Sequence, residues 1–455
     1  MSYRIVGRKS PKSIDNSTLI LFGYATAFFP RLFSYFGVPP TINFVHFLTI
    51  PIIFIIAIFT AKPRNTRQIA IVWELVVALG ILLICTIASA LINEAGAINV
   101  FLQYILQAEP FLLLIAIMSI PMQGQNFYKF KNWLFGFALF NLLLAIAQSF
   151  LIPLGIYPRR GGTIADNIAG VFASSRGSAG NYVSCSVSLY FALYFFLVFK
   201  KVPLWIRITG LLAAVYQTQV SDSKQVFLAF IVGAIILLIT KSDNPKKLLI
   251  YFTVTIIFLT VSFWAIKNLE ADFLTPYQNW INRSHIYGPD GEATQTKLAA
   301  FRIIPTHFNS PLNWLFGLGP GHTVGRLGGW MMQKYSDLLV PMGGTLHPAS
   351  AEVFQVVRSG WIAKQSTIFF PLFTWVGIWG DQGIVGLGAY IYLGSIVWRK
   401  VCVDDLGRFL ILSTVVLGFI LTQMEEPGHM LTIVCLLGLR WHEEQERRAQ
   451  NQVNF

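Results

Sequence analysis

The sequence has few charged residues and few cysteines for its length. Only 12% of its 455 residues are charged, whereas 55% are hydrophobic and the mean hydropathy is +0.59. A soluble protein of this size does not need so much apolar sequence, so a soluble globular fold is excluded. The four cysteines form no CxxC pair and three of them lie in apolar runs. This excludes a disulfide framework and a cysteine-ligated metal site.

Several familiar sequence signals are also missing. The first residues, MSYRIVGRKSPK, lead into no short apolar region with a small-residue cleavage site, so we expect no cleavable signal peptide. We see no internal repeat and no inverted pair of halves, which weakens a secondary-transporter interpretation. The large loop described below contains no HExxH or DxD motif, and the chain has no nucleophile elbow. Metal catalysis and Ser-His-Asp chemistry therefore have little support.

Long apolar runs, in contrast, are abundant. Crossing a hydrocarbon layer about 30 Å thick takes about 17 to 25 apolar residues. We predict twelve spans, at residues 18–37, 41–61, 68–92, 97–120, 132–154, 180–199, 204–221, 224–240, 248–267, 380–398, 407–423 and 427–441. Most Lys and Arg residues fall in joints that can all lie on one side, so the net charge of +13 reflects the positive-inside bias and not nucleic-acid binding. We expect an all-α polytopic membrane protein with both termini in the cytoplasm.

The predicted domain organisation is uneven across the membrane. Residues 1–267 hold the first nine spans and a smaller outer loop at 155–180, residues 380–441 hold the last three spans, and residues 442–455 form a cytoplasmic tail. Residues 268–379 form one large outer loop, and loops of that length are uncommon unless they are functional. It contains the glycine-rich segment PLNWLFGLGPGHTVGRLGG at residues 311–329. Its amphipathic stretches suit a ligand that is half lipid and half water-soluble.

Basic residues on the predicted outer side are the first candidates for ligand binding. Lys224 follows Ser221, Asp222 and Ser223 at the outer end of a span. There an ammonium group can neutralise a phosphate, and serine hydroxyls can donate to its oxygens. The alternative is a lysine that extends to the interface and pairs with Asp222. Arg302 lies on an amphipathic segment just before the glycine-rich segment, and its alternative is a solvated helix face.

The glycine-rich segment supplies further candidates. Gly319 and Gly321 can bring backbone N–H groups close to an anion, although the same pattern is also typical of an ordinary turn. His322 and His347 have an ordinary pKa near neutrality, which suits general bases, but a lone histidine in a loop is more often a surface residue.

Two acidic residues lie inside predicted spans. A carboxylate in hydrocarbon costs at least ~2.5 kcal/mol, so Glu109 and Glu74 must face the protein interior or water. They form either a proton or cation relay or a structural pair with Arg31, which is itself isolated in the apolar stretch FFPRLFSYF. We favour the structural pair.

The order of four stretches resembles the superfamily of O-antigen ligases and O-antigen polymerases. DNIAGVFASSRGSAGNYVSCSVSLYF resembles its Gly-Thr-Phe region, and VSDSKQVFLAFIVGAIILLI resembles its Ser-Arg motif, with Lys224 where arginine is usual. FRIIPTHFNSPLNWLFGLGPG is similar to its Arg, Pro and Gly-x-Gly-Pro-Gly block, and FTWVGIWGDQGIVGLGAYIYL to the segment that returns into the membrane. The likeness covers residues from about 160 to 400 and is carried by the order of the motifs.

This resemblance implies an all-helical, C-type glycosyltransferase of the bacterial cytoplasmic membrane. Its donor would be an oligosaccharide on undecaprenyl pyrophosphate, and its reaction would need no cofactor and no metal. Membrane lipids would surround it, and a flippase and a chain-length regulator of the same pathway would be partners. The expected pyrophosphate and glycan ligands are Lys224, Arg302, Arg176, Ser221, Ser223, Gly319, Gly321, His322 and Arg326. The acceptor proton would go to one of His347, Glu352, Asp222 and Asp166.

One departure from the family pattern separates the possible activities. Ligases of the family usually carry a histidine about eleven residues before the Gly-x-x-Gly, and here Leu372 occupies that position. We therefore favour a polymerase that joins repeat units of a surface polysaccharide, with a ligase as the alternative. Two other classes stay open: a transporter or flippase of lipid-linked or anionic solutes, and, ranked last, a metal-assisted transferase with a monosaccharide polyprenyl-phosphate donor.

Overall fold

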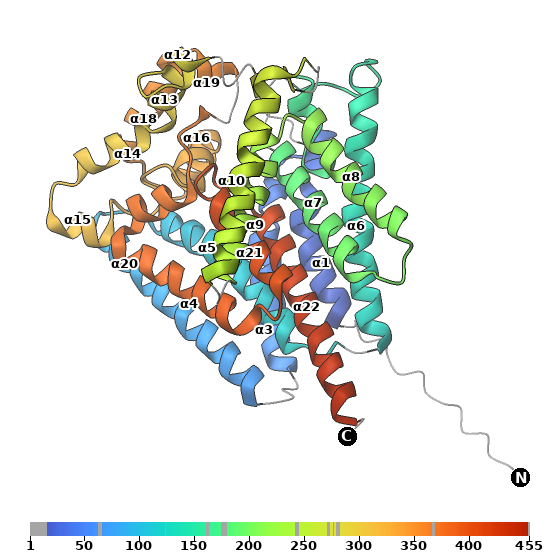
Figure 1. The fold of residues 1–455 in the computed structure, drawn as a ribbon. Coiled ribbons are helices and arrows are strands. Elements are labelled where there is room, and N and C mark those ends of the chain that lie inside the picture. Colours follow the sequence, from blue (N-terminus) through green and yellow to red (C-terminus); the bar gives the residue numbers. More distant parts are fainter. Residues whose placement is uncertain are drawn as a thin grey trace, which may run out of the picture.

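The protein is all-helical in the part of the chain that the structure describes. The computed structural model describes residues 16–61, 66–122, 124–160, 163–173, 180–241, 245–270, 274–275, 277–278, 283–365 and 369–453. Helices make up 80% of it, and these residues form no strand. Figure 1 shows the long helices packed side by side and the short helices of residues 283–365 gathered at one end, away from the C-terminal end of α22 (Pro427–Val453). The prediction of an α-helical membrane protein is confirmed at this level.

The long helices carry the apolar runs of the sequence, and short helical turns connect some of them. The helical elements before residue 270 are α1 (Asn16–Phe28), α2 (Pro30–Tyr35), η1 (Pro40–Phe44), α3 (His46–Thr60), α4 (Thr66–Ile92), α5 (Ala97–Ser119), α6 (Gly124–Leu151), η2 (Ala165–Asn167), η3 (Gly170–Phe172), α7 (Gly180–Val198), α8 (Leu204–Val220), α9 (Lys224–Thr240) and α10 (Pro245–Asn268). After residue 370 they are α20 (Thr374–Ile396), η8 (Val397–Val401), α21 (Asp405–Leu417), η9 (Gln423–Glu425) and α22 (Pro427–Val453).

Six helical stretches among the described residues are long and apolar enough to cross a membrane. They are Pro40–Thr60, Thr66–Ile92, Ala97–Ser119, Gly124–Leu151, Gly180–Val198 and Thr374–Val401. Each coincides with or contains most of a predicted span. The other six predicted spans also fall on helices, but these are shorter, interrupted or more polar, so the count of twelve and the orientation stay predictions. The first is divided because Pro30, which lacks an N–H, ends α1 and begins α2.

Helix α5 forms the centre of the bundle. It packs against α3, α4 and α22, and from Leu102 onward almost every side chain on it is buried. A helix that is apolar on all sides is typical of such a position. The polar exceptions on α5 are the buried residues Asn99, Gln103, Gln107 and Glu109, and each must find a partner inside the protein.

The predicted large loop folds into short helices with a core of its own. These are α12 (Ser284–Tyr287), α13 (Glu292–Lys297), α14 (Ala299–Ile303), η5 (Ile304–His307), α15 (Pro311–Phe316), η6 (Leu327–Met331), α16 (Met332–Lys334), α17 (Ser336–Leu339), α18 (Pro348–Ser359) and α19 (Ile362–Gln365). Ala300, Ile304, Val324 and Val353 pack together with Phe373 and Val376 at the start of α20. This shared apolar core attaches the loop to the bundle.

Candidate functional site

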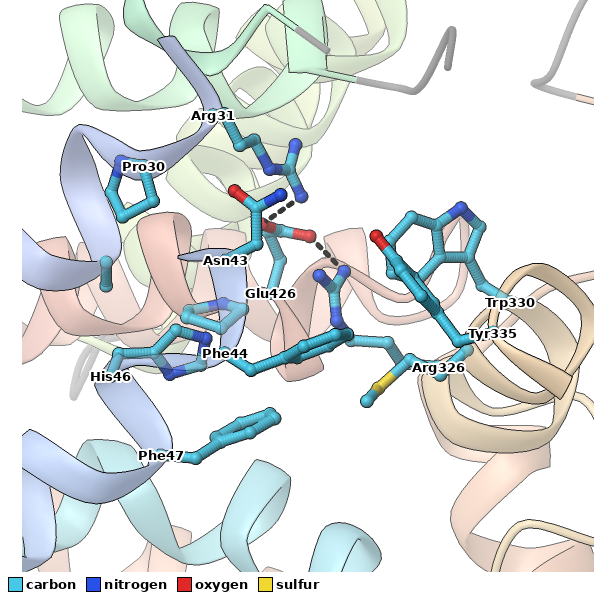
Figure 2. A pocket seen from close by; sticks show the side chains of 13 residues that line it. Pro30, Arg31, Asn43, Phe44, His46, Phe47, Arg326, Trp330, Tyr335 and Glu426 are labelled. Atoms are coloured by element: carbon cyan, nitrogen blue, oxygen red, sulfur yellow. Dashed lines mark hydrogen bonds and ion pairs between the residues drawn. The ribbon is translucent and has the colours of Figure 1, made fainter. Parts of the chain in front are cut away.

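Two arginines from distant parts of the chain meet at one carboxylate. Arg31 lies in α2, Arg326 immediately precedes η6, and Glu426 immediately precedes α22. Figure 2 shows both guanidinium groups directed at Glu426: Arg31 Nη2 lies 2.5 Å from Glu426 Oε1, and Arg326 Nη1 donates to Glu426 Oε2. Both arginine side chains are 13% exposed and that of Glu426 is 8% exposed. This triad joins the N-terminal helices, the loop and the C-terminal helix.

The triad lines an enclosed hollow with a mixed polar and aromatic wall. Asn43, His46, Phe44, Trp330 and Tyr335 are among the other lining residues, and the remaining open space is 30 Å³, about the volume of one water molecule. The Arg326 guanidinium lies 5.0 Å from the centre of the Trp330 ring, a cation–π distance. In this state Glu426 itself occupies the anion position between the arginines.

The electrostatics of the triad are those of charged groups held inside a buried pocket. Burial acts to raise the pKa of Glu426, but the two guanidinium groups outweigh it and hold that pKa below its ordinary value. Burial lowers the pKa of Arg326, although its guanidinium group stays protonated. The hollow therefore presents two cations to one anion and carries a surplus positive charge.

Glu425, the preceding residue, turns away from this hollow. Its Oε2 accepts a hydrogen bond of 3.0 Å from the backbone N–H of Arg326, whereas its Oε1 is buried with no hydrogen-bond partner among the described residues. Burial is the main reason that the pKa of Glu425 rises to about 8. Neighbouring glutamates thus have opposite pKa shifts because only Glu426 faces the arginines.

The glycine-rich segment wraps around a carboxylate of the protein itself. The backbone N–H groups of Gly321 and Thr323 donate to Asp381 of α20 at 3.0 and 2.8 Å, and the Thr323 hydroxyl adds a third bond of 2.7 Å. The N–H of Gly319 donates to the backbone oxygen of Asp381 at 3.0 Å. Gly319 and Gly321 were predicted to approach an anion of the ligand, and in this structure their N–H groups bind Asp381 instead.

Glycine is required where this segment touches α20. Gly317 has a φ of +72°, and a Cβ added there would lie 2.4 Å from the carbonyl carbon of Asp381. A Cβ on Gly377 of α20 would lie 2.4 Å from the Cα of Gly325. The segment is therefore an inserted structural element with close backbone packing, which explains its composition better than flexibility does.

Three histidine rings of the loop lie in a row, in which His322 stacks on His347 and His307 meets His347 edge to face. The ring of His347 lies 5.4 Å from that of His322 and 5.6 Å from that of His307, and His307 Nε2 lies 2.9 Å from an oxygen of the exposed Glu352. His347 Nδ1 accepts the N–H of Ala349 and so caps α18. Burial lowers the pKa of His347 to about 4, so its neutral form carries the remaining proton on Nε2. This arrangement does not favour His347 as a general base.

His322, which was predicted as a ligand or a base, lies deep in the loop. Its Nδ1 lies 2.7 Å from the backbone oxygen of Leu318 and its Nε2 lies 2.8 Å from the Thr345 hydroxyl. Burial lowers its pKa, so the ring is neutral near pH 7. Both nitrogens are thus engaged in holding the loop together.

Lys224 and its neighbours Ser221 and Ser223 are buried, whereas Asp222 between them is exposed. Lys224 is buried and pairs with Asp222, which is the alternative that the sequence left open, and its ammonium lies 5.7 Å from the ring centre of Tyr277. The hydroxyls of Ser221 and Ser223 are 3.1 Å apart, and Ser221 also donates to the Gln217 carbonyl at 2.6 Å. Asp222 is 57% exposed at its side chain.

The structure does not gather the remaining predicted residues with Lys224. Arg302 is bonded to Gln295 and lines a separate hollow with Leu298 and Phe301. Asp166 closes a local turn by accepting the N–H and hydroxyl of Thr163. Arg176 lies outside the described residues. Arg326 is the predicted ligand that lines the hollow of Figure 2.

The intramembrane acids have partners other than the predicted one. We favoured a pair between Arg31 and Glu109 or Glu74, and this prediction is wrong: Glu109 lies 2.7 Å from His46 Nδ1, and Glu74 pairs with Lys400. The partner of Arg31 is Glu426. The sequence did contain a signal for the correct pair. Arg31 is near the outer end of its predicted span, level with the joint that holds Glu426, whereas Glu109 lies in the middle of a span.

No group of three or more His, Cys, Asp or Glu residues in the described part of the chain is arranged to hold a metal ion. Comparison of the chain with family models, with curated proteins and with solved structures finds no match.

Proposed function

We propose that this protein is a membrane glycosyltransferase that joins repeat units of a surface polysaccharide, with a glycan on undecaprenyl pyrophosphate as donor. One observation carries the proposal: Arg31 from the helical bundle and Arg326 from the folded loop converge in a shared, enclosed hollow. The order of motifs in the sequence points to the same class of enzyme. The basic pair assigned to the pyrophosphate is therefore Arg31 and Arg326, in place of Lys224 and Arg302.

The chemistry of the leaving group suits this pair. Breaking the bond between sugar and pyrophosphate develops negative charge on phosphate oxygens, and guanidinium groups stabilise such oxygens through two parallel N–H bonds each. An enclosed, partly buried site strengthens this interaction. Glu426 occupies the anion position in the present state, so a phosphate group would displace it from at least one arginine. Trp330, Tyr335 and Phe44 provide flat apolar surfaces for the sugar next to the phosphate.

The first prediction concerns catalysis in purified protein. Arg326→Ala and Arg31→Ala are each expected to lower the release of polyprenyl pyrophosphate from a lipid-linked oligosaccharide by about 100-fold, because each removes one cation from the leaving-group site. Arg326→Lys is expected to retain only part of the wild-type rate, because an ammonium group cannot make a bidentate contact with phosphate oxygens. Product is measured by mass spectrometry of the lipid and by the length of the glycan on a gel.

The matched control is Arg358→Ala. Arg358 is an exposed cation of the same loop, so its replacement removes an equal charge at a distance from the hollow. The Arg358→Ala variant should have the wild-type rate. Wild-type rates in well-folded Arg31→Ala and Arg326→Ala proteins would reject the assigned site.

A second class of function has one specific observation in its favour. Helix α20 is interrupted at Gly383, which has φ 66° and ψ −165°, and α5 contains Pro110. Interrupted helices are typical of transporters, where they expose backbone groups to a solute. Flux of a lipid-linked oligosaccharide across proteoliposomes, with no new glycosidic bond, would favour this alternative over the enzyme.

A further inference from the structure

A set of buried polar atoms at the centre of the bundle has no hydrogen-bond partner among the described residues. They are both amide atoms of Gln103, Nε2 of Gln107, Oε1 of Gln382 and Oε1 of Glu425. All four side chains belong to residues that are at most 1% exposed. Polar atoms without partners are costly in a dry interior, so a bound species is expected beside them.

These atoms line one seam between α5, α20 and η9. Gln103 and Gln107 are one turn apart and therefore lie on the same face of α5. Gln382 Nε2 donates to Gln107 Oε1 at 3.1 Å and to the Thr86 hydroxyl at 3.0 Å. The Gln103 amide lies beside the Glu425 carboxyl, close enough to affect its pKa. We refer to Gln103, Gln107, Gln382 and Glu425 as the carboxamide seam.

Glu425 is the acidic group of the seam. Glu425 interacts electrostatically with Asp381, with Arg326 and with the hydroxyl of Tyr390. Through Arg326 it joins the triad with Glu426 and Arg31. Burial, which raises the pKa of Glu425 to about 8, disfavours the ionised form of its carboxyl group. A cation bound at Oε1 would supply the counter-charge that this buried carboxylate needs when it is ionised.

A break in α20 lies beside the seam, and the carbonyl oxygens of Gly380 and Asp381 before it already accept N–H groups of the glycine-rich segment, which leaves side-chain oxygens as the ligands. The interruption of α20 at Gly383 immediately follows Gln382, so the regular helix ends where the unpartnered Gln382 oxygen lies. Breaks in membrane helices are places where carbonyl groups and helix ends coordinate monovalent cations. The available ligands are hard oxygen atoms, which favour alkali and alkaline-earth ions over transition metals.

We propose that the carboxamide seam binds a single monovalent cation, with Na⁺ as the first ion to test. The ligands are Glu425 Oε1 and the side-chain oxygens of Gln103 and Gln382. The single carboxyl group of the seam, when ionised, matches a charge of +1, whereas a divalent ion would leave a positive excess. The inference does not rest on the proposed glycosyl transfer, because it concerns a site inside the bundle and not the hollow of Arg31 and Arg326.

The test is thermal unfolding of the purified full-length protein at constant ionic strength, with Na⁺ replacing N-methyl-D-glucamine. Ligand that binds only the folded state raises the transition temperature with concentration, and we expect a rise of about 3 °C or more between 1 and 100 mM Na⁺. Equilibrium dialysis with radioactive Na⁺ should give about one ion per chain under the same conditions. Neither measurement depends on enzymatic activity.

Three variants complete the experiment. Glu425→Gln keeps the size of the side chain and removes its charge, and it should abolish both the thermal response and the bound ion. If that variant does not fold, Gln103→Leu provides the same test from the opposite helix. Glu352→Gln removes an exposed carboxylate of the loop and should respond as the wild type does. Equal transition temperatures in Na⁺, K⁺ and N-methyl-D-glucamine, or a full Na⁺ response in Glu425→Gln, would overturn the proposal.

Discussion

Replacing Glu426 with leucine is expected to destabilise the folded protein by about 3 to 5 kcal/mol, because it leaves two buried guanidinium groups with no shared counter-charge. Arg31 and Arg326 are both directed at this carboxylate, and neither side chain is more than 13% exposed. The loss should be visible as a lower midpoint of thermal unfolding. Glu352→Leu, which removes an exposed carboxylate, should change that midpoint little.

A triple variant separates the structural role of the triad from its proposed catalytic role. Replacing Arg31 and Arg326 with methionine together with Glu426→Leu removes all three charges, and apolar replacement of a complete buried ion cluster is often neutral or stabilising. We expect the unfolding midpoint to return towards the wild-type value while glycosyl transfer stays absent. If the triple variant regains activity together with stability, the triad is structural only and the site must lie elsewhere.

The second large effect is expected at Asp381. Its carboxylate accepts the N–H groups of Gly321 and Thr323 as well as the Thr323 hydroxyl. Asp381→Asn turns one acceptor atom into a donor, so at least one buried N–H loses its partner whichever way the amide is oriented. Loss of charge-assisted bonds and an unsatisfied donor together should cost about 3 kcal/mol or more.

Asp381→Asn should loosen the loop locally as well as lower the stability of the whole protein. Because the glycine-rich segment is attached to α20 through this carboxylate, the loop should become more sensitive to limited proteolysis at temperatures where the bundle stays folded. Asp337→Asn is the matched control, since Asp337 is an exposed carboxylate of the same loop. Equal proteolysis rates for Asp381→Asn and the wild type would contradict the role that we give to this contact.

The sequence allowed the helices to be located but not the contacts between their polar residues. Apolar runs predicted the six long spans because the requirement to satisfy backbone groups in lipid is met within each helix, from local sequence alone. The predicted span 18–37, however, missed the break that Pro30 makes between α1 and α2. In contrast, the partners of Arg31, Glu109 and Glu74 were assigned wrongly, because these three residues share an apolar sequence setting but lie at different depths in their spans.

For the glycine-rich segment, too, the sequence predicted a local property but not the residue that it contacts. Its glycines indicated that backbone N–H groups would approach an anion, and the structure places an anion there, but it is Asp381, some sixty residues further along the chain.

What the sequence by itself determined is therefore the helical character of the chain, the position of its long apolar segments and the presence of polar residues that needed partners. Only the tertiary structure decided that Arg31 meets Glu426, that the glycine-rich segment binds Asp381 and that Gln103 faces Glu425. The physical reason is that helix formation depends on neighbouring residues, whereas the pairing of buried charges depends on how helices hundreds of residues apart pack together.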